Sequence, residues 1–262
     1  MTGKDSMIYL FNDAGRAALR NFIERSTLFA FDLDGTLAPL VVDPALIEIP
    51  DEILEPLIRL NKMAPVAVIT GRALNDALPH LGFKPGFLVG NHGAEGLPGR
   101  EKQEKEFYRQ GREWRAQLDQ LMTDFAESAI FLEDKGATFA LHYRNTPDQD
   151  TAKDKIIKAI ITLEPLPRRV PGKFVENIVP VDAPHKGDAF VQLMSHTGCS
   201  KAMFVGDDVT DEDVFNLRDE RIFGVRIGAG TGSSARYYLR DIDEMAGFIE
   251  MIIEGVSGEG GS

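Results

Sequence analysis

Two aspartates, Asp32 and Asp34, stand one residue apart at the end of the apolar run LFAF. Two carboxylates at the carboxyl end of a buried strand are costly unless they bind a cation or other partners. Gly35 follows them, and glycine allows a tight turn that aims backbone carbonyls at a metal. One carboxylate of such a pair can act as a nucleophile while its neighbour transfers a proton. Taken alone, the pair could equally be a surface turn.

Thr70 and Lys186 are the residues that could bind an anion. Thr70 ends the run VAVIT, and a helix is predicted to begin after Arg72. Thr70 can therefore offer its hydroxyl, with the amides of the helix N-terminus, to a phosphate. The alternative role for Thr70 is a helix cap. Lys186 opens another predicted helix, where a cation opposes the helix dipole, and a phosphate or phosphorylated aspartate beside it would explain its position.

A second group of carboxylates occupies the run AMFVGDDVTDEDVF. Asp207 and Asp208 end a predicted strand, and three more acidic residues, 211–213, crowd the next turn. Mutual repulsion disfavours this crowding unless a divalent cation is close by. The alternative is that residues 211–213 serve the N-terminus of a helix running to Leu217, while Asp207 faces the metal.

Short apolar runs rich in β-forming residues precede most of these polar residues, and helical patterns separate most of the runs. This alternation is typical of a parallel sheet with crossover helices. Ligands of such sheets bind beyond the carboxyl ends of the strands. The runs are LFAFDL, VAVIT, GFLVG, AMFVGD and RIFGVRI. The sequence therefore predicts an α/β fold with a Rossmann-like parallel core.

The alternation of short strands and helices stops between about Pro98 and Pro180. A long charged helical pattern is followed by the alternating run ATFALHYR and by another helix around residues 156–163. We interpret residues 98–180 as an inserted α+β domain in a core made of residues 1–97 and 181–262. One apolar stripe at helical spacing is predicted to pack inside the insert: Trp114, Leu118, Leu121 and Phe125.

The composition argues against several classes of partner. Twenty-nine basic and 41 acidic side chains give a net charge of −12, which disfavours nucleic acid and anionic membranes. No run approaches the roughly 20 apolar residues of a membrane span. Cys199 is the one cysteine, so the chain can form no intrachain disulfide. We therefore expect a cytoplasmic protein that acts on a small molecule, and the oligomeric state stays open.

Taken together and in chain order, four motifs resemble the haloacid dehalogenase-like superfamily of phosphotransferases. They are DLDGT at 32–36, Thr70, Lys186 and GDD at 206–208. The resemblance spans nearly the whole chain, and the insert resembles the type-two cap of that superfamily. It implies a phosphatase in which Asp32 is the nucleophile and Asp34 the general acid and base. Thr70 and Lys186 would then hold the non-reacting phosphate oxygens.

The same resemblance implies Mg²⁺ as the cofactor. The side chain of Asp32, the backbone carbonyl of Asp34, Asp207 and waters would bind the ion, which suits a hard cation that keeps several waters. Asp208 and Asp211 would support these ligands from behind.

Finer features resemble one family, the trehalose-6-phosphate phosphatases. They are VITGR, GNHGAEG, FLEDKGATFALHYR and GDDVTDEDVF. The implied substrate is a phosphorylated disaccharide, and the implied sugar-binding residues are Glu133, Lys135 and Glu176, with Arg72, His92 and Arg144 as further candidates. In this family a basic residue closely follows the last glutamate, whereas Glu176 is followed by Asn177, Ile178 and Val179.

Three alternatives stay open at this point. The charged residues of the insert could be ordinary surface ion pairs, and His142 is expected to have a structural role. The substrate could be sucrose phosphate, mannosylglycerate phosphate or a sugar monophosphate. A non-catalytic sugar-phosphate sensor is the third reading, but it would require loss of the nucleophile or the proton donor, and the chain has both.

Overall fold

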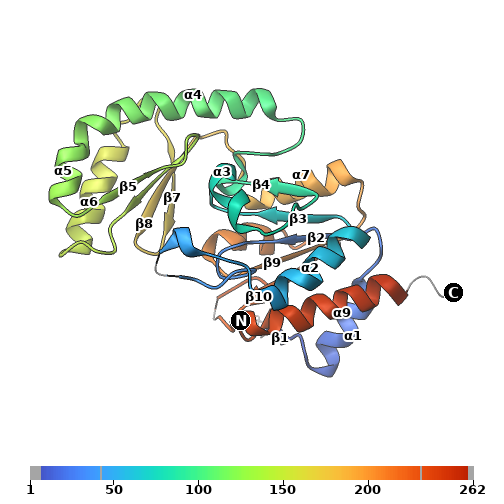
Figure 1. The fold of residues 1–262 in the computed structure, drawn as a ribbon. Helices are drawn as coiled ribbons and strands as arrows, with labels where there is room; N and C mark the ends of the chain where they lie inside the picture. Colours follow the sequence, from blue (N-terminus) through green and yellow to red (C-terminus); the bar gives the residue numbers. More distant parts are fainter. Residues whose placement is uncertain (1–6, 42, 231, 259–262) are drawn as a thin grey trace, which may run out of the picture. The chain divides into compact units, whose positions relative to one another are not determined.

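The computed structural model describes residues 7–41, 43–230 and 232–258, and the chain divides into two compact units. Unit 1 is Met1–Gly93 with His185–Ser262, and unit 2 is Ala94–Pro184. Each unit has its own sheet (Figure 1). The predicted insert, residues 98–180, lies within unit 2. The predicted fold class, a parallel α/β core with an α+β insert, is confirmed.

A seven-stranded parallel sheet forms the centre of unit 1. Its order is β1-β11-β10-β9-β2-β3-β4. The strands are β1 Ile8–Tyr9, β2 Leu28–Phe31, β3 Val66–Ile69, β4 Phe87–Val89, β9 Ala202–Gly206, β10 Ile222–Ile227 and β11 Tyr237–Leu239. The five predicted runs form the adjacent strands from β10 to β4. The sequence pattern did not indicate β1 and β11, which are only two and three residues long.

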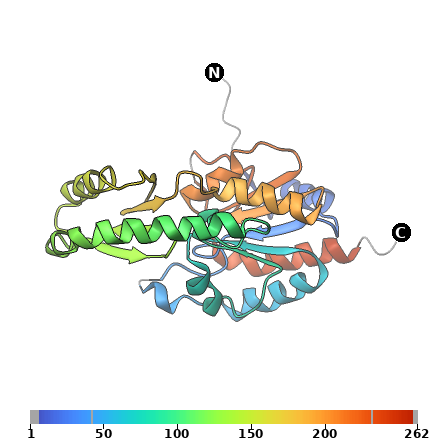
Figure 2. The ribbon, with the colours of Figure 1, turned by 90° about the horizontal axis from the view of Figure 1, so that it is seen from above.

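Helices cover both faces of this sheet. They are α1 Asp13–Phe22, α2 Asp51–Met63, α3 Leu74–Ala77, α7 Lys186–Thr197, α8 Glu212–Phe215 and α9 Met245–Gly258. Met203 and Val205 of β9 join the apolar cluster that contains α2 and α9 side chains. Phe204, between them, packs edge-on against Phe190 of α7 and Phe215 of α8. Figure 2 shows α7 and α9 on opposite sides of the strands. Burial on both faces explains why β2, β3 and β9 are apolar throughout, whereas β10 alternates between buried and half-buried residues.

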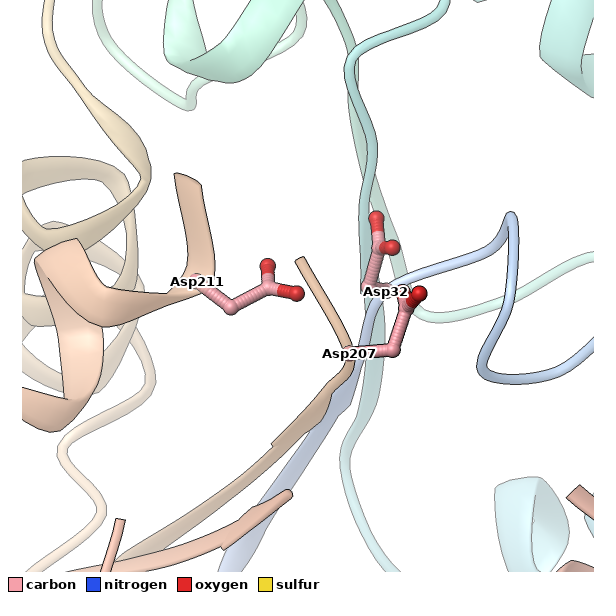
Figure 3. A group of neighbouring side chains, drawn as sticks. All are labelled: Asp32, Asp207 and Asp211. Carbon is pink, nitrogen blue, oxygen red and sulfur yellow. The ribbon is translucent and has the colours of Figure 1, made fainter. Parts of the chain in front are cut away.

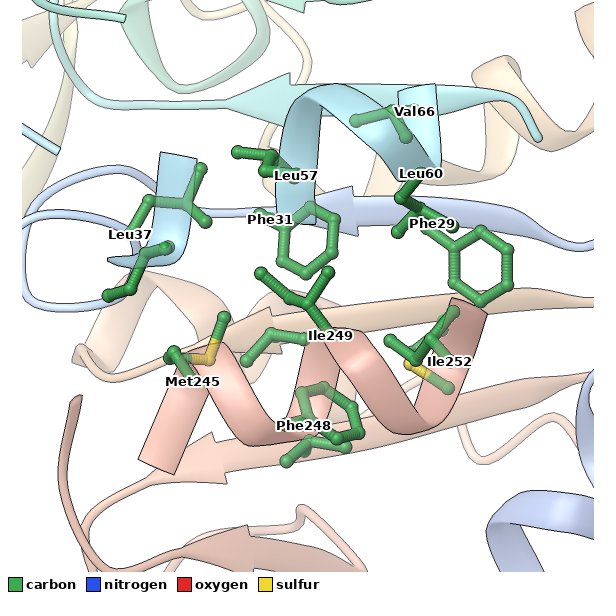
Figure 4. Packing of buried hydrophobic residues seen from close by; sticks show 14 of the residues in the cluster. Phe29, Phe31, Leu37, Leu57, Leu60, Val66, Met245, Phe248, Ile249 and Ile252 are labelled. Atoms are coloured by element: carbon green, nitrogen blue, oxygen red, sulfur yellow. The ribbon is translucent and has the colours of Figure 1, made fainter. Parts of the chain in front are cut away.

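A large apolar cluster of unit 1 holds β2, which is an interior strand of the sheet. Figure 4 shows aromatic side chains of β2 among side chains of α2 and α9, all of them buried: Phe29, Phe31, Leu57, Leu60, Ile249 and Ile252. Burying each such side chain contributes about 1.5 to 3 kcal/mol. The strand that precedes Asp32 is therefore held by buried apolar side chains of α2 and α9.

Unit 2 is an antiparallel sheet packed against helices. The strand order is β5-β6-β8-β7. The elements are α4 Glu101–Leu118, α5 Met122–Glu127, β5 Phe131–Asp134, β6 Phe139–His142, α6 Gln149–Ile160, β7 Arg168–Gly172 and β8 Val175–Val179. Trp114, Leu118 and Phe125 are buried in one cluster, and Leu121 packs at its edge, so the predicted core role of this stripe is confirmed. The indole Nε1 of Trp114 donates to the carbonyl of Pro165 at 2.6 Å.

The register of this sheet decides which side chains face the helices. Directly paired residues of neighbouring strands project to the same face. Leu141 of β6, which belongs to the Trp114 cluster, pairs with Glu176 of β8, so Glu176 projects toward the helices. Ala140 pairs with both Glu133 and Asn177, which therefore share the other face. We call that side, carrying Phe131, Glu133, His142 and Asn177, the polar face of unit 2.

Among the described helices, none is both long enough and apolar enough to cross a membrane.

The buried indole of Trp114 allows a direct test of the unit 2 core. We expect Trp114→Ala to lower the free energy of unfolding by about 3 to 5 kcal/mol, because it removes a fully buried aromatic side chain and leaves a cavity. Ile161→Ala, at an exposed apolar side chain of the same unit, is the control and should change it by less than about 0.5 kcal/mol. Urea unfolding followed by circular dichroism measures both, and equal effects would contradict the packing described here.

Candidate active site

Polar residues from four segments meet at the carboxyl edge of the unit 1 sheet. Asp32 follows β2, Thr70 follows β3 and Asp207 follows β9. These three strands are neighbours in the order β9-β2-β3, so their carboxyl ends lie side by side. Lys186, the first residue of α7, reaches the same edge. The fold thus gathers the motifs that the sequence separates by more than 170 residues.

Lys186 connects the motifs. Its Nζ donates to Oδ1 of Asp32 at 2.8 Å and to Oδ1 of Asp211 at 2.7 Å, and all three residues are buried. Burial alone lowers the pKa of Lys186, but the carboxylates of Asp211 and Asp32 outweigh it and raise that pKa overall. The N-terminus of α7 is capped separately by His185, which accepts from the amide of Asp188 at 3.2 Å. Two carboxylates therefore stabilise this cation at a helix start, where the helix dipole opposes it.

Three carboxylates converge beside this lysine. Asp32, Asp207 and Asp211 each offer an oxygen within 4.8 Å of the others, and Figure 3 shows Asp211 pointing toward the other two. Burial raises the pKa of Asp32 well above its usual range, against the opposing effect of Lys186. Burial, then the charges of Asp211 and Asp208, raise the pKa of Asp207 to about 7. One lysine cannot neutralise three carboxylates, and an all-oxygen donor set suits a hard divalent cation.

Gly35 allows the loop after β2 to approach Asp207. Its φ is +84°, and a Cβ at this position would lie 2.3 Å from Oδ2 of Asp207. Its amide donates to the carbonyl of Ala38 at 2.7 Å, which closes the turn. Any side chain here would therefore both strain the backbone and collide with a carboxylate of the cluster. This explains the glycine of the DLDGT motif.

The side chain of Asp34 lies outside the three-carboxylate cluster and binds Arg72 instead. The Arg72 guanidinium donates through Nε to both oxygens of Asp34, at 3.1 and 2.8 Å, and through Nη2 to Oδ1 at 2.7 Å. Its Nη1 donates to Asp76 at 2.8 Å. Burial alone lowers the pKa of Arg72, but its bonds to Asp34 and Asp76 raise that pKa overall. The structure thus places Arg72 on the predicted proton-transfer residue.

Thr70 is buried, and its Oγ1 accepts from the amide of Arg72 at 3.1 Å. It caps no helix, because α3 begins at Leu74 and its N-cap residue makes no side-chain bond. The amide of His92 donates to the carbonyl of Thr70 at 3.0 Å. A Cβ on Gly71 would lie 2.4 Å from Cε1 of His92, so the imidazole sits against the backbone beside Thr70. The GNHGAEG segment thereby supports the loop that presents Thr70.

Asp211 has two roles that the sequence left as alternatives. Its Oδ2 accepts from the amide of Asp208 at 2.9 Å, which closes the short helical turn after β9. Its Oδ1 binds Lys186, and the carboxylate belongs to the cluster with Asp32 and Asp207. The sequence had left nearness to a divalent cation and service at a helix N-terminus as alternatives for residues 211–213, and the resemblance had implied a place for Asp211 behind the metal ligands. Its position four residues after Asp207, one turn on, was the available signal.

The polar face of unit 2 carries an ionic group around Glu133. Its Oε2 lies 2.8 Å from Nε2 of His142, and its Oε1 lies 3.8 Å from Nζ of Lys135. The His142 ring also packs against Phe131, with ring centroids 5.9 Å apart. Arg144 is exposed, and its guanidinium lies 5.9 Å from the ring centre of Phe174. Glu133, Lys135 and His142 therefore lie together on this face.

Glu176 is not brought to this group. It is fully buried on the helix side, where its Oε2 accepts from Nε of Arg169 at 3.0 Å and its Oε1 lies 4.0 Å from Nζ of Lys153. Asn177, one residue on, shares the polar face with Glu133. The side-chain Nδ2 of Asn177 donates to the carbonyl of Val170 at 3.1 Å. The sequence analysis named Glu176 and not Asn177 for this group. Neighbouring residues of a strand point to opposite faces, so a difference of one position changes which residue lies beside Glu133.

The raised pKa of Asp207 predicts that the acidic cluster lowers the free energy of unfolding by an amount that depends on pH. A carboxyl whose pKa is raised by folding from 3.8 to about 7 destabilises the folded protein increasingly as pH rises through that range, because the folded state binds more protons. Without metal, Asp207→Asn should therefore be more stable than the unaltered protein at pH 8, by about 1 to 3 kcal/mol. The advantage should shrink toward pH 5.

Thermal unfolding in chelator at both pH values measures this difference. Added Mg²⁺ should stabilise the unaltered protein and have little effect on Asp207→Asn, because a ligand stabilises only the state that binds it. If the Asp207→Asn protein were less stable than the unaltered protein in chelator at pH 8, the carboxylate of Asp207 would not destabilise the fold as predicted.

Comparisons with known proteins show to which family the chain belongs. The profile of the family described as Trehalose-phosphatase matches residues 30–242. The trehalose-6-phosphate phosphatase of Escherichia coli is 32% identical over 231 residues, which cover 85% of each chain. A probable trehalose-phosphate phosphatase of Sinorhizobium fredii is 31% identical over 225 residues, 82% of this chain and 81% of that protein. Trehalose-phosphate phosphatase B of Arabidopsis thaliana is 25% identical, and the chain spans 65% of its length.

Solved structures share the fold. The C-terminal domain of a Candida albicans trehalose-6-phosphate phosphatase aligns with a TM-score of 0.74 and 21% identity, over 96% of this chain and 99% of that one. A Synechocystis sucrose-phosphatase aligns with a TM-score of 0.55 and 18% identity, over 86% and 98%. The family profile covers most of the chain, and the bacterial relatives match it over most of their own lengths. The chain therefore belongs to the trehalose-phosphatase family.

Proposed function

We propose that this protein hydrolyses trehalose 6-phosphate to trehalose and phosphate through a phosphorylated Asp32. The observation that carries the proposal is the buried contact of Lys186 with Asp32 inside the three-carboxylate cluster. A nucleophilic carboxylate needs a nearby cation to approach an anionic phosphate, and the cluster can bind a second cation. The E. coli and S. fredii relatives are named for this activity, which supports the choice of substrate.

The reaction has two displacements at phosphorus. A carboxylate oxygen of Asp32 forms a bond to phosphorus while the bond from phosphorus to the sugar oxygen breaks. Asp34 donates a proton to that oxygen, and trehalose leaves. A water molecule then loses a proton to Asp34 and attacks phosphorus, which releases phosphate and restores Asp32. Thr70 and Lys186 would hold the non-reacting phosphate oxygens through their hydroxyl and ammonium groups.

Mg²⁺ is the cofactor that we propose for the acidic cluster. Asp32 and Asp207 would bind it through their side chains and Asp34 through its backbone carbonyl. Asp211 and Asp208 would orient these ligands, although the place of Asp211 in the cluster also makes its carboxylate a possible ligand. Bound there, the ion would neutralise the charge of the carboxylates and of the phosphate.

Sugar recognition is the role that we propose for the polar face of unit 2. Glu133 and Lys135 offer a carboxylate and an ammonium of the kind that bind hydroxyl groups, and each holds the other in place. Asn177 is the neighbouring polar side chain on that face. Glu176 would act from the helix side, by supporting the strand that carries Asn177. Arg144 and His92 stay further candidates for contact with the substrate.

The nucleophile is tested by Asp32→Asn, a nearly isosteric change that removes the attacking charge. We expect turnover of trehalose 6-phosphate to fall by at least about a thousandfold while the protein stays folded, because the amide cannot form the phosphorylated intermediate. Asp51→Asn, at an exposed residue of α2, is the matched control.

Phosphate release is measured across a panel of sugar phosphates, with Mg²⁺ and with chelator. Activity of Asp32→Asn within tenfold of the unaltered enzyme would refute the assignment. A preference for sucrose phosphate, mannosylglycerate phosphate or a monosaccharide phosphate would assign the protein to that related substrate class. Full activity in chelator would show that catalysis does not require a metal ion.

The sugar-binding role is tested by Glu133→Ala and Lys135→Ala. Each should lower kcat/KM for trehalose 6-phosphate by about ten- to a hundredfold, because each removes a charged hydrogen-bonding group worth about 1.5 to 3 kcal/mol. p-Nitrophenyl phosphate should be affected far less, since it has no sugar. Glu127→Ala, at an exposed residue of α5, is the control. Equal losses on both substrates would mean that Glu133 and Lys135 support the fold instead.

A further inference from the structure

We propose that Arg72 is a positioning residue, which fixes the Asp34 carboxylate for proton transfer and is itself anchored by Asp76. The proposal rests on the function proposed above and assigns Arg72 a role other than the direct substrate contact expected from the sequence. It follows from how the three side chains are connected.

The contact between Arg72 and Asp34 is a two-pronged one. Nε and Nη2 of Arg72 face the two oxygens of Asp34, with donor distances of 2.8 Å to Oδ2 and 2.7 Å to Oδ1. Such paired bonds fix the orientation of a carboxylate as well as its position, which a single lysine cannot do. The third nitrogen, Nη1, donates to Asp76 one helical turn after Arg72. Every nitrogen of the guanidinium is thus bound to a carboxylate.

Arg72 is the fixed partner of this pair. Its side chain is only 10% exposed, whereas that of Asp34 is 32% exposed. Its amide donates to Oγ1 of Thr70, and its carbonyl accepts from the amide of Asn91 at 2.7 Å. Backbone and side chain are therefore both held, by residues that belong to two strand ends. Asp34 lies in the loop after β2, so the orientation of its carboxylate depends on Arg72.

Proton transfer depends strongly on this orientation. A carboxylate must place one oxygen within hydrogen-bond reach of the oxygen that leaves the phosphate, and small errors of position cost much of the rate. Oδ1 of Asp34 accepts from both Nε and Nη2 of Arg72, whereas Oδ2 accepts from Nε alone. Each carboxylate oxygen has two lone pairs, so Oδ2 can still exchange a proton on its other side. The contact with Arg72 can therefore persist during the reaction.

The test compares leaving groups. An alkyl phosphate such as trehalose 6-phosphate needs a proton on its leaving oxygen, whereas p-nitrophenolate leaves readily without one. In Arg72→Ala we expect the first turnover of the alkyl phosphate to slow by about a hundredfold, the lower range of general acid catalysis. The first-turnover burst of p-nitrophenol should slow by less than about fivefold, and KM should change little. The first turnover is used because Asp34 also activates the water of the second step.

Two further variants distinguish a positioning role of Arg72 from a role in folding. Asp76→Asn keeps Arg72 and Asp34 but removes the anchor, and should give the same selectivity for leaving group with a smaller loss. Arg59→Ala, at an exposed arginine of α2 paired with Glu250, should leave both rates unchanged. Circular dichroism verifies that each protein is folded.

Three results would overturn the proposal. They are equal slowing of both first turnovers, a raised KM with unchanged kcat, and no effect on either substrate. A preference for another sugar phosphate would revise the proposed function but not this comparison, because any alkyl phosphate that the unaltered enzyme hydrolyses can replace trehalose 6-phosphate.

Discussion

One buried lysine shared between two aspartates is the interaction on which the active site depends. Lys186 binds Asp32 and Asp211 away from solvent, where an unpaired charge would cost several kcal/mol. The pairing holds together the end of β2, the start of α7 and the turn after β9. Because Asp207 adds a third carboxylate, the site keeps an excess of negative charge that a divalent cation is suited to balance. The same excess would otherwise repel a phosphorylated substrate.

The rest of unit 1 can be understood as the support for this charged group. The central strands are buried on both faces, so their carboxyl ends cannot shift without disturbing the packing of α2, α7 and α9. Gly35 lets the loop after β2 lie against Asp207, and the hydrogen bond from the amide of His92 to the carbonyl of Thr70 fixes the loop after β3. Arg72 links the two loops through Asp34. Apolar packing sets the positions of the strand ends, and polar contacts then set the orientations of the side chains.

Unit 2 follows a different principle, because its sheet has two unlike faces. One face is packed under the Trp114 cluster, and the other carries Glu133 and its partners. Such a sheet can present polar groups on a rigid support while its core stays apolar. Glu176 is an exception, since it is a buried carboxylate on the apolar side, and Arg169 and Lys153 lie close enough to balance it. This ionic group ties β7 and α6 to β8.

The sequence by itself determined the fold class, the five adjacent strands from β10 to β4 and the residues at their carboxyl ends, because apolar runs and the order of motifs are local signals. Asp32, Thr70 and Asp207 became candidates through their places after strands, and Lys186 through its place at the start of a helix. Only the tertiary structure decided which of them touch, since the contact of Lys186 with Asp32 joins residues 154 positions apart.

The partner of Asp34 and the face of Glu176 were also beyond the sequence. Arg72 is 38 residues from Asp34 and meets it only because β2 and β3 are neighbours in the sheet. The face of a strand residue is set by its pairing with other strands, and the pattern of β8 alone does not reveal that pairing. Local periodicity shows that a strand exists, but its register and its contacts depend on the packing of the whole chain.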